Sequence, residues 1–160
     1  MAARFGRSQA AVFSSWAGIA DAAEASPGSV QLFAGRDGVG SAYRPDAETA
    51  SRALAYASEQ APQFLFVGLG DTDEAAHQGD YLAYLDALVE ADVWIGRFWQ
   101  LAQRREACGQ PTTLFVTTDH GRARDFREHE HASEAGATWL VASGDRVRER
   151  GIIRGGAREL

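Results

Sequence analysis

Short continuous runs of apolar residues punctuate the chain and predict buried β-strands. The three clearest runs are residues 64–70 (Phe-Leu-Phe-Val-Gly-Leu-Gly), 112–118 (Thr-Thr-Leu-Phe-Val-Thr-Thr) and 138–142 (Thr-Trp-Leu-Val-Ala). Runs of this length are typical of strands that are buried on both faces of a parallel sheet. A shorter run at residues 29–34 predicts a further strand.

Between these runs, apolar residues recur at helical spacing. Residues 8–25 show this spacing and are followed by Ser-Pro-Gly, so they predict a helix. Asp46 is placed to be the N-cap of a second helix, and a long helix is predicted over residues 80–106. One stripe of the long helix carries Tyr81, Leu85, Leu88, Asp92, Ile95 and Trp99, which are apolar except for Asp92.

This alternation of strands and helices predicts an α/β fold. The expected architecture is a mostly parallel sheet flanked by helices, with right-handed crossovers. Residues 35–45, which are rich in glycine, predict a loop. Polar residues just past the strand ends of such a sheet face the ligand crevice, so residues 71–77 and 119–131 are the segments in which to expect a site.

Composition narrows the class of protein. The chain has 160 residues, of which 45% are apolar and 24% charged, as expected for one soluble globular domain. Its net charge of −6 argues against a nucleic-acid binder, and no apolar run is long enough for a membrane span. The single Cys108 excludes internal disulfides and a Cys-rich zinc module. No targeting segment is recognisable, and nothing indicates a compartment.

Two Asp and His pairs follow the two clearest strands. Asp73 and His77 come after the first, and Asp119 and His120 come directly after the second. Carboxylate and imidazole are ligands that suit zinc, manganese or iron. Asp-x-x-x-His lets one tight turn place an oxygen and a nitrogen about 2.0–2.2 Å from one ion. A further His in residues 119–135 would complete such a site.

A structural interpretation of the same residues is also open. An acid at a strand end, such as Asp71, is often a helix cap or a solvated loop residue, and a lone His in a loop is usually a surface residue. Against this, every histidine of the chain falls in the two segments that the strand pattern places at one edge: His77, His120, His129 and His131.

The residues quoted above resemble the alkaline phosphatase superfamily, and most closely its sulfatase-like and phosphodiesterase-like branch. The resemblance covers residues 62–144 and is carried by Gly-Asp-Thr-Asp-Glu-Ala-Ala-His at 70–77, the helix at 81–92 and Thr-Thr-Asp-His-Gly-Arg at 117–122. It implies an alkaline-phosphatase-like fold and a metal-dependent enzyme that hydrolyses a small-molecule phosphate or sulfate ester.

The resemblance also implies a centre of two divalent ions, zinc or alternatively manganese. Asp73 and His77 match the ligands of one ion, which a later His completes; His129, in the context Phe-Arg-Glu-His, matches best, and His131 is the rival. Asp119 and His120 match ligands of the second ion. Two such ions clamp the attacking and leaving oxygens of an in-line transfer at phosphorus or sulfur.

The chain departs from the family pattern upstream of these motifs. The family's nucleophile and one further carboxylate lie far before the Asp-x-x-x-His. Asp37 and Ser41 resemble such a start only superficially and also fit a Gly-rich turn, while Cys108 is a poor nucleophile candidate. We therefore expect residues 1–160 to form one incomplete domain, the C-terminal part of a hydrolase domain, that is weakly active or inactive alone. An upstream segment would supply the rest.

Three further features of the sequence each allow two interpretations. Arg122 and Arg124 could hold a phosphate or sulfate oxygen, or balance the acids of residues 125–134. Asp92 could support a ligand His or have a structural role. The whole chain could instead be a non-catalytic or degenerate metal-binding α/β domain, or an α/β interaction domain with surface histidines.

Overall fold

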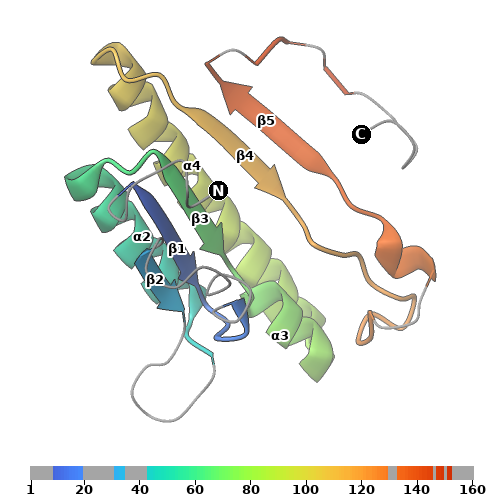
Figure 1. Ribbon diagram of the computed structural model, residues 1–160. Helices are drawn as coiled ribbons and strands as arrows, with labels where there is room; N and C mark the ends of the chain where they lie inside the picture. Colours follow the sequence, from blue (N-terminus) through green and yellow to red (C-terminus); the bar gives the residue numbers. More distant parts are fainter. Residues whose placement is uncertain are drawn as a thin grey trace.

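The computed structural model describes residues 9–19, 31–34, 43–129, 133–145, 147–149 and 151–152. Within them a three-stranded parallel sheet has the order β2-β1-β3, formed by β1 (Ala10–Ser14), β2 (Gln31–Ala34) and β3 (Phe64–Gly68). Together with the helices that pack on it, this sheet confirms the α/β class (Figure 1).

The central strand β1 corrects a prediction, because a helix was expected over residues 8–25. Ala10 to Ser14 are all buried, and both neighbouring strands pair with this segment. A short apolar run fits a helix stripe and a doubly buried strand equally well, and only pairing with other strands decides between them. Residues 20–30, where the predicted helix would continue, lie outside the described residues.

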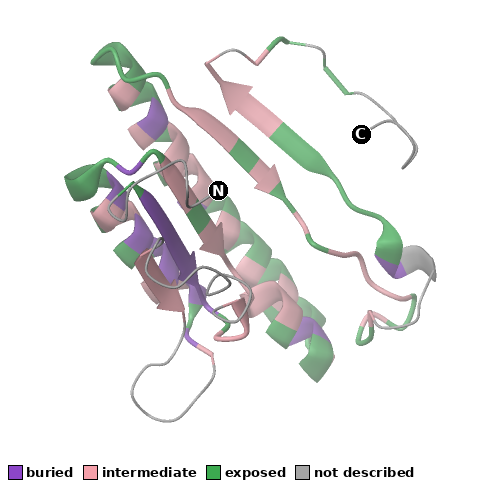
Figure 2. Cartoon of the chain, viewed as in Figure 1, coloured by how far each residue is buried: buried purple, intermediate pink, exposed green. Residues whose placement is uncertain are grey.

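In the described part of the chain, three longer helices accompany the sheet: α2 (Asp46–Gln60), α3 (Asp71–Gln78) and α4 (Tyr81–Ala107). Both α2 and α4 run beside the parallel sheet, and α2 contacts β1, β3 and α4 (Figures 1 and 2). The core is centred on Ala11, Phe13 and Ala53. Phe13 stacks on Phe33 with a centroid separation of 4.4 Å. The buried small residues of α2 let its backbone lie close to β1.

A second sheet holds the predicted strands at 112–118 and 138–142. Its strands, β4 (Thr113–Thr117) and β5 (Leu140–Gly144), pair antiparallel. Among the described residues, β4 is hydrogen-bonded to β5 and not to β3. Figure 1 shows β4 running in the same direction as β1 and β3, and β5 running in the opposite direction. The carboxyl ends of β3 and β4 therefore point to the same end of the molecule.

The long helix α4 lies at the predicted residues, but the residues that it buries differ from the predicted apolar stripe. Asp80 caps it, because its side chain accepts a hydrogen bond of 3.0 Å from the N–H of Ala83. Trp94 and Ala102 are buried, whereas Tyr81, Leu85 and Leu88 of the expected stripe are exposed. Asp92 is exposed as well. No helix in the described part of the chain is long and apolar enough to cross a membrane.

Candidate metal centre

The helix α3 brings Asp73 and His77 together. It begins three residues after the end of β3, and residues four apart on a helix share one face. The His77 Nε2 atom lies 3.4 Å from Asp73 Oδ2. Gly79 ends α3 with a φ of 73°, a conformation that glycine adopts without strain. The pair thus sits at the carboxyl end of the parallel sheet (Figure 1).

Two further histidines reach the same carboxylate from the segment after β4. The Nε2 atoms of His120 and His129 lie 3.8 Å and 4.0 Å from Asp73 Oδ1. Their rings stack with a centroid separation of 4.0 Å, and the His77 ring meets His129 edge-on at 5.0 Å. One carboxylate and three imidazoles therefore face one another.

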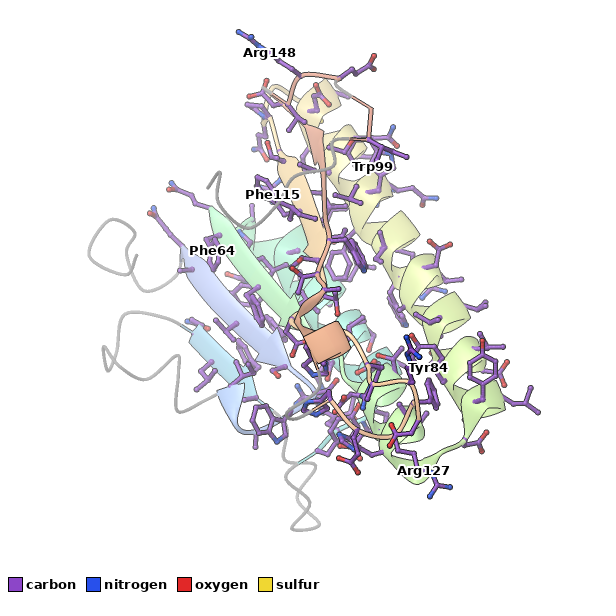
Figure 3. All side chains as sticks on the ribbon, turned by 90° about the vertical axis from the view of Figure 1, so that its right-hand side faces the viewer. Phe64, Tyr84, Trp99, Phe115, Arg127 and Arg148 are labelled. Atoms are coloured by element: carbon purple, nitrogen blue, oxygen red, sulfur yellow. The ribbon has the colours of Figure 1, made fainter. Side chains whose placement is uncertain are left out.

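The loop that carries His129 is anchored to α4 by an aromatic contact. Phe126, with a positive φ of 72°, packs its ring against Tyr81 and Tyr84 at centroid separations of 5.3 Å and 4.9 Å. Figure 3 shows Tyr84 and Arg127 at the same end of the molecule. This contact holds the turn at Phe126 against α4. Three residues later in the same loop, His129 lies beside His120 and Asp73.

A backbone contact sets the tautomer of His120. Its Nδ1 atom lies 2.9 Å from the carbonyl oxygen of Gly121. A carbonyl only accepts hydrogen bonds, so in the neutral ring Nδ1 carries the proton and Nε2 keeps its lone pair. That lone pair is on the side of Asp73, which is the arrangement required of a metal-ligating imidazole.

The ligand atoms of Asp73, His120 and His129 fit a divalent ion. They all lie within 4.8 Å of one another, and the three residues are half-buried. Ligand atoms on a tetrahedral zinc ion are about 3.4 Å apart, so side-chain adjustments of an ångström or so would close the site. The mixture of carboxylate oxygen and imidazole nitrogen is typical of zinc and manganese centres.

Asp119 lies at the outer side of this cluster. Its side chain is 87% exposed, and Oδ2 is 3.6 Å from His120 Nε2. Its other oxygen accepts a hydrogen bond from the N–H of His120. Asp119 therefore contacts His120, but it is not among the residues whose ligand atoms gather around Asp73.

Arg122 contacts the cluster from within the protein. Its Nη2 donates to Asp73 Oδ1 and, at 3.2 Å, to the carbonyl of Asp73. Its Nη1 donates to the carbonyl of Arg127. Burial lowers the pKa of Arg122, and the nearby charge of Glu128 partly opposes this. Of the two predicted anion-binding arginines, Arg122 thus reaches the candidate site, while Arg124 is exposed.

The remaining sequence candidates lie elsewhere. His131, Asp37 and Ser41 fall outside the described residues, so the choice between His129 and His131 is informed only by the inward position of His129. Cys108 is exposed and follows the last turn of α4, at the far end of that helix from α3 (Figure 1).

Sequence reasoning missed a buried polar network beneath the cluster. Asp46 is 4% exposed and is the first residue of α2, with Pro45 at the N-cap position, so the predicted N-cap role is wrong. Its carboxylate accepts hydrogen bonds from the N–H groups of Gly70 and Asp71, at 2.8 Å and 2.9 Å. Ser15 Oγ donates to the same carboxylate at 2.5 Å. Asp46 therefore fixes the start of α3.

The Asp71 side chain in turn accepts a hydrogen bond from the start of α2. Its Oδ2 accepts from the N–H of Asp46 at 3.1 Å, and its Oδ1 accepts from the hydroxyl of Tyr43 at 2.5 Å. Burial raises the pKa of Tyr43, and donation to Asp71 raises it further, so Tyr43 stays protonated. Burial also raises the pKa of Asp46, against the opposing effect of its hydrogen bonds. The only sequence signal was an acid at the start of each helix.

Comparison with known proteins supplies the family. The family model of the metalloenzyme superfamily matches residues 6–149, which is most of the chain. No curated protein and no solved structure matches the chain significantly. The chain belongs to the metalloenzyme superfamily, a family of the alkaline phosphatase-like superfamily.

Proposed function

We propose that this chain carries the ion-binding part of a site for hydrolysis of phosphate or sulfate esters, of the sulfatase-like or phosphodiesterase-like type. The observation that carries the proposal is the meeting of Asp73, His120 and His129, whose ligand atoms lie within 4.8 Å of one another. These residues come from α3 and from the segment after β4, which lie far apart in the sequence. Family membership supports a metal-dependent activity.

The residues divide naturally between two ions. Following the family pattern, Asp73, His77 and His129 would hold one ion, and Asp119 and His120 would hold the other. Zinc fits this donor set best, and manganese is the alternative. Divalent ions bound here would polarise the ester oxygen and lower the pKa of the attacking hydroxyl or water.

The chain's own residues contribute orientation. Gly121 fixes the His120 ring through Nδ1, and Asp46 holds the turn that presents Asp73. The sequence assigns no nucleophile. We therefore propose that the isolated chain binds a divalent ion and hydrolyses esters slowly or not at all, as part of a larger domain.

Calorimetric titration with zinc tests the ion site directly. We expect the Asp73→Ala, His77→Ala double variant to bind zinc at least about 100-fold more weakly than the wild type, because loss of even an outer-shell partner costs roughly 10- to 100-fold. A matched control changes two exposed positions of α4, Asp86→Ala and Gln103→Ala, and should bind like the wild type. Equal zinc binding by both double variants would contradict the site assignment.

Hydrolysis assays separate this proposal from a non-catalytic metal-binding domain. Aryl phosphate and aryl sulfate are the probes, with His120→Ala as the comparison. Slow hydrolysis that His120→Ala abolishes supports the enzymatic proposal. Zinc binding with no hydrolysis that depends on His120, even at high enzyme concentration, favours the non-catalytic alternative for this chain. Fast hydrolysis would show that the chain contains a nucleophile after all.

A further inference from the structure

Arg122 occupies the same carboxylate oxygen that faces the imidazoles. Its Nη2 donates to Asp73 Oδ1, and this oxygen is 3.8 Å from His120 Nε2 and 4.0 Å from His129 Nε2. The Arg122 side chain is only 15% exposed. A guanidinium thus lies within the donor set that would bind the ion.

Charge explains why the guanidinium is there. A half-buried carboxylate without a cation is costly, and Arg122 supplies the compensating charge. A divalent ion on Asp73 Oδ1 would carry two positive charges to the position next to the guanidinium. Because like charges repel strongly when partly shielded from water, ion and guanidinium cannot share this oxygen favourably. An ion bound at Oδ1, the oxygen that faces His120 and His129, therefore requires Arg122 to leave it.

Arg122 stays near the site when it leaves the carboxylate. Its Nη1 donates to the carbonyl of Arg127 at 3.2 Å, a contact that is independent of the Asp73 carboxylate. Arg127 in turn lies against Gly79 at the end of α3. The guanidinium is thus tethered beside the ligand set by the backbone carbonyls of Arg127 and Asp73, and the N–H that leaves the carboxylate becomes available to an anion. A planar fork of N–H groups matches the oxygens of a phosphate or sulfate group.

We infer that Arg122 is a resident counter-cation that holds Asp73 while no ion is bound and binds an anionic oxygen of the ester once an ion has displaced it. This inference rests on the proposed function, because it takes Asp73 as an ion ligand. The ion and the guanidinium then compete for the Asp73 carboxylate. Binding of the ion and binding of the ester's anionic oxygen are cooperative, because the ion releases Arg122 to the ester.

Two titrations of the Arg122→Gln variant test the exchange, with Arg104→Gln, an exposed arginine in the last turn of α4, as the charge-matched control. Zinc alone should bind Arg122→Gln about fivefold more tightly than wild type, because the competing cation is gone. Inorganic sulfate added to the zinc-loaded protein should bind Arg122→Gln about tenfold more weakly. The control should match wild type in both titrations.

Each outcome bears on a different claim. Wild-type protein that binds no zinc overturns the proposed function and this inference with it. Zinc binding that Arg122→Gln leaves unchanged or weakens overturns the exchange and leaves the ion site standing. Arg122→Lys guards against a misfolded variant: it keeps the charge and loses the planar fork, so zinc affinity should stay close to wild type while sulfate affinity falls. Unchanged sulfate affinity in both variants contradicts the anion role.

Discussion

At the scale of single residues, two aspartates hold the starts of two helices together. Asp46 and Asp71 each accept a hydrogen bond from the first backbone N–H of the helix that the other begins. Both carboxylates lie at helix N-termini, where the dipole favours negative charge. Because α3 carries Asp73 and His77, this exchange also determines where the candidate ligands lie relative to the sheet.

Asp46→Asn should destabilise the fold by about 1 kcal/mol near neutral pH. Oδ1 of Asp46 faces the N–H of Gly70, and Oδ2 faces the N–H of Asp71. Either orientation of the amide therefore sets an NH₂ group against a backbone donor, although removing a buried charge offsets part of the cost. Urea unfolding measures the change, with the exposed Asp86→Asn as control. Equal stability of Asp46→Asn and wild type would contradict the capping role.

The same variant gives a pH signature with a definite sign. Burial raises the pKa of Asp46 above its ordinary value of 3.8, so the folded protein binds the proton more tightly than the unfolded chain. The stabilising contribution of Asp46 is therefore complete below pH 3.8 and declines as pH rises through the folded-state pKa. We therefore expect the difference in unfolding free energy between wild type and Asp46→Asn to become smaller as the pH rises from 3.8 through the folded-state pKa of Asp46. An advantage that widens with pH would mean that hydrogen bonding outweighs burial.

The residues of the candidate site were predictable where local sequence positions them. Asp73 and His77 were expected on one tight turn after a strand, and the structure places them one turn apart on the helix α3. His120 was expected at the end of a strand. The placement of Arg122 on Asp73 and the exchange between Asp46 and Asp71 were not predictable. Each joins segments tens of residues apart, and neither is encoded in a local pattern. Ion ligation by these residues stays a prediction.

At the scale of elements, turn chemistry decides where α3 stops. Gly79 has a φ of 73°, and a Cβ added there would lie 2.4 Å from Arg127 Nε. An alanine would therefore meet backbone strain, whereas a small shift of the exposed Arg127 side chain would relieve the contact. Gly96, inside α4, has no atom within 4 Å of its added Cβ. Substitution by alanine should therefore lower stability at Gly79 and raise it at Gly96.

Thermal unfolding of two alanine variants tests this difference. Gly79→Ala should lower stability by about 1–2 kcal/mol, the cost of a left-handed residue. Gly96→Ala should raise it by about 0.5–1 kcal/mol, because alanine is the better helix former. Loss of stability in both variants would show that Gly96 makes a packing contact absent from this structure.

Element types were predictable where the pattern was long and failed where it was short. The 27 residues of α4 extend over many helical turns, so their period is unambiguous. The five residues of β1 are too few to separate a helix stripe from a buried strand, which is why the predicted helix was wrong over Ala10–Ser14. The antiparallel pairing of β4 and β5 was also missed, because strand direction depends on the path of the loop between them.

At the scale of the whole molecule, large apolar side chains are exposed on α4 and on the second sheet. Leu82, Leu85, Val89 and Val93 are spaced so that they lie along one side of α4, and Leu82 and Val89 are 73% and 66% exposed. Phe115, Leu140 and Val141 are exposed on the second sheet. Figure 2 shows exposed stretches on α4 and β5. Contiguous apolar surface of this kind favours association or aggregation.

We expect the isolated chain to associate as its concentration rises and to bind a hydrophobic dye while folded. Leu82→Glu with Val89→Glu should reduce both effects, because two charges interrupt the apolar side of α4 where neither substitution removes a buried side chain. Sedimentation velocity over a concentration series measures association. Leu101→Glu is the contrasting variant: its side chain is half-buried, so it should lower the unfolding temperature without the same gain in solubility. A monodisperse wild type with no dye binding would show that the exposed side of α4 is too narrow to drive association.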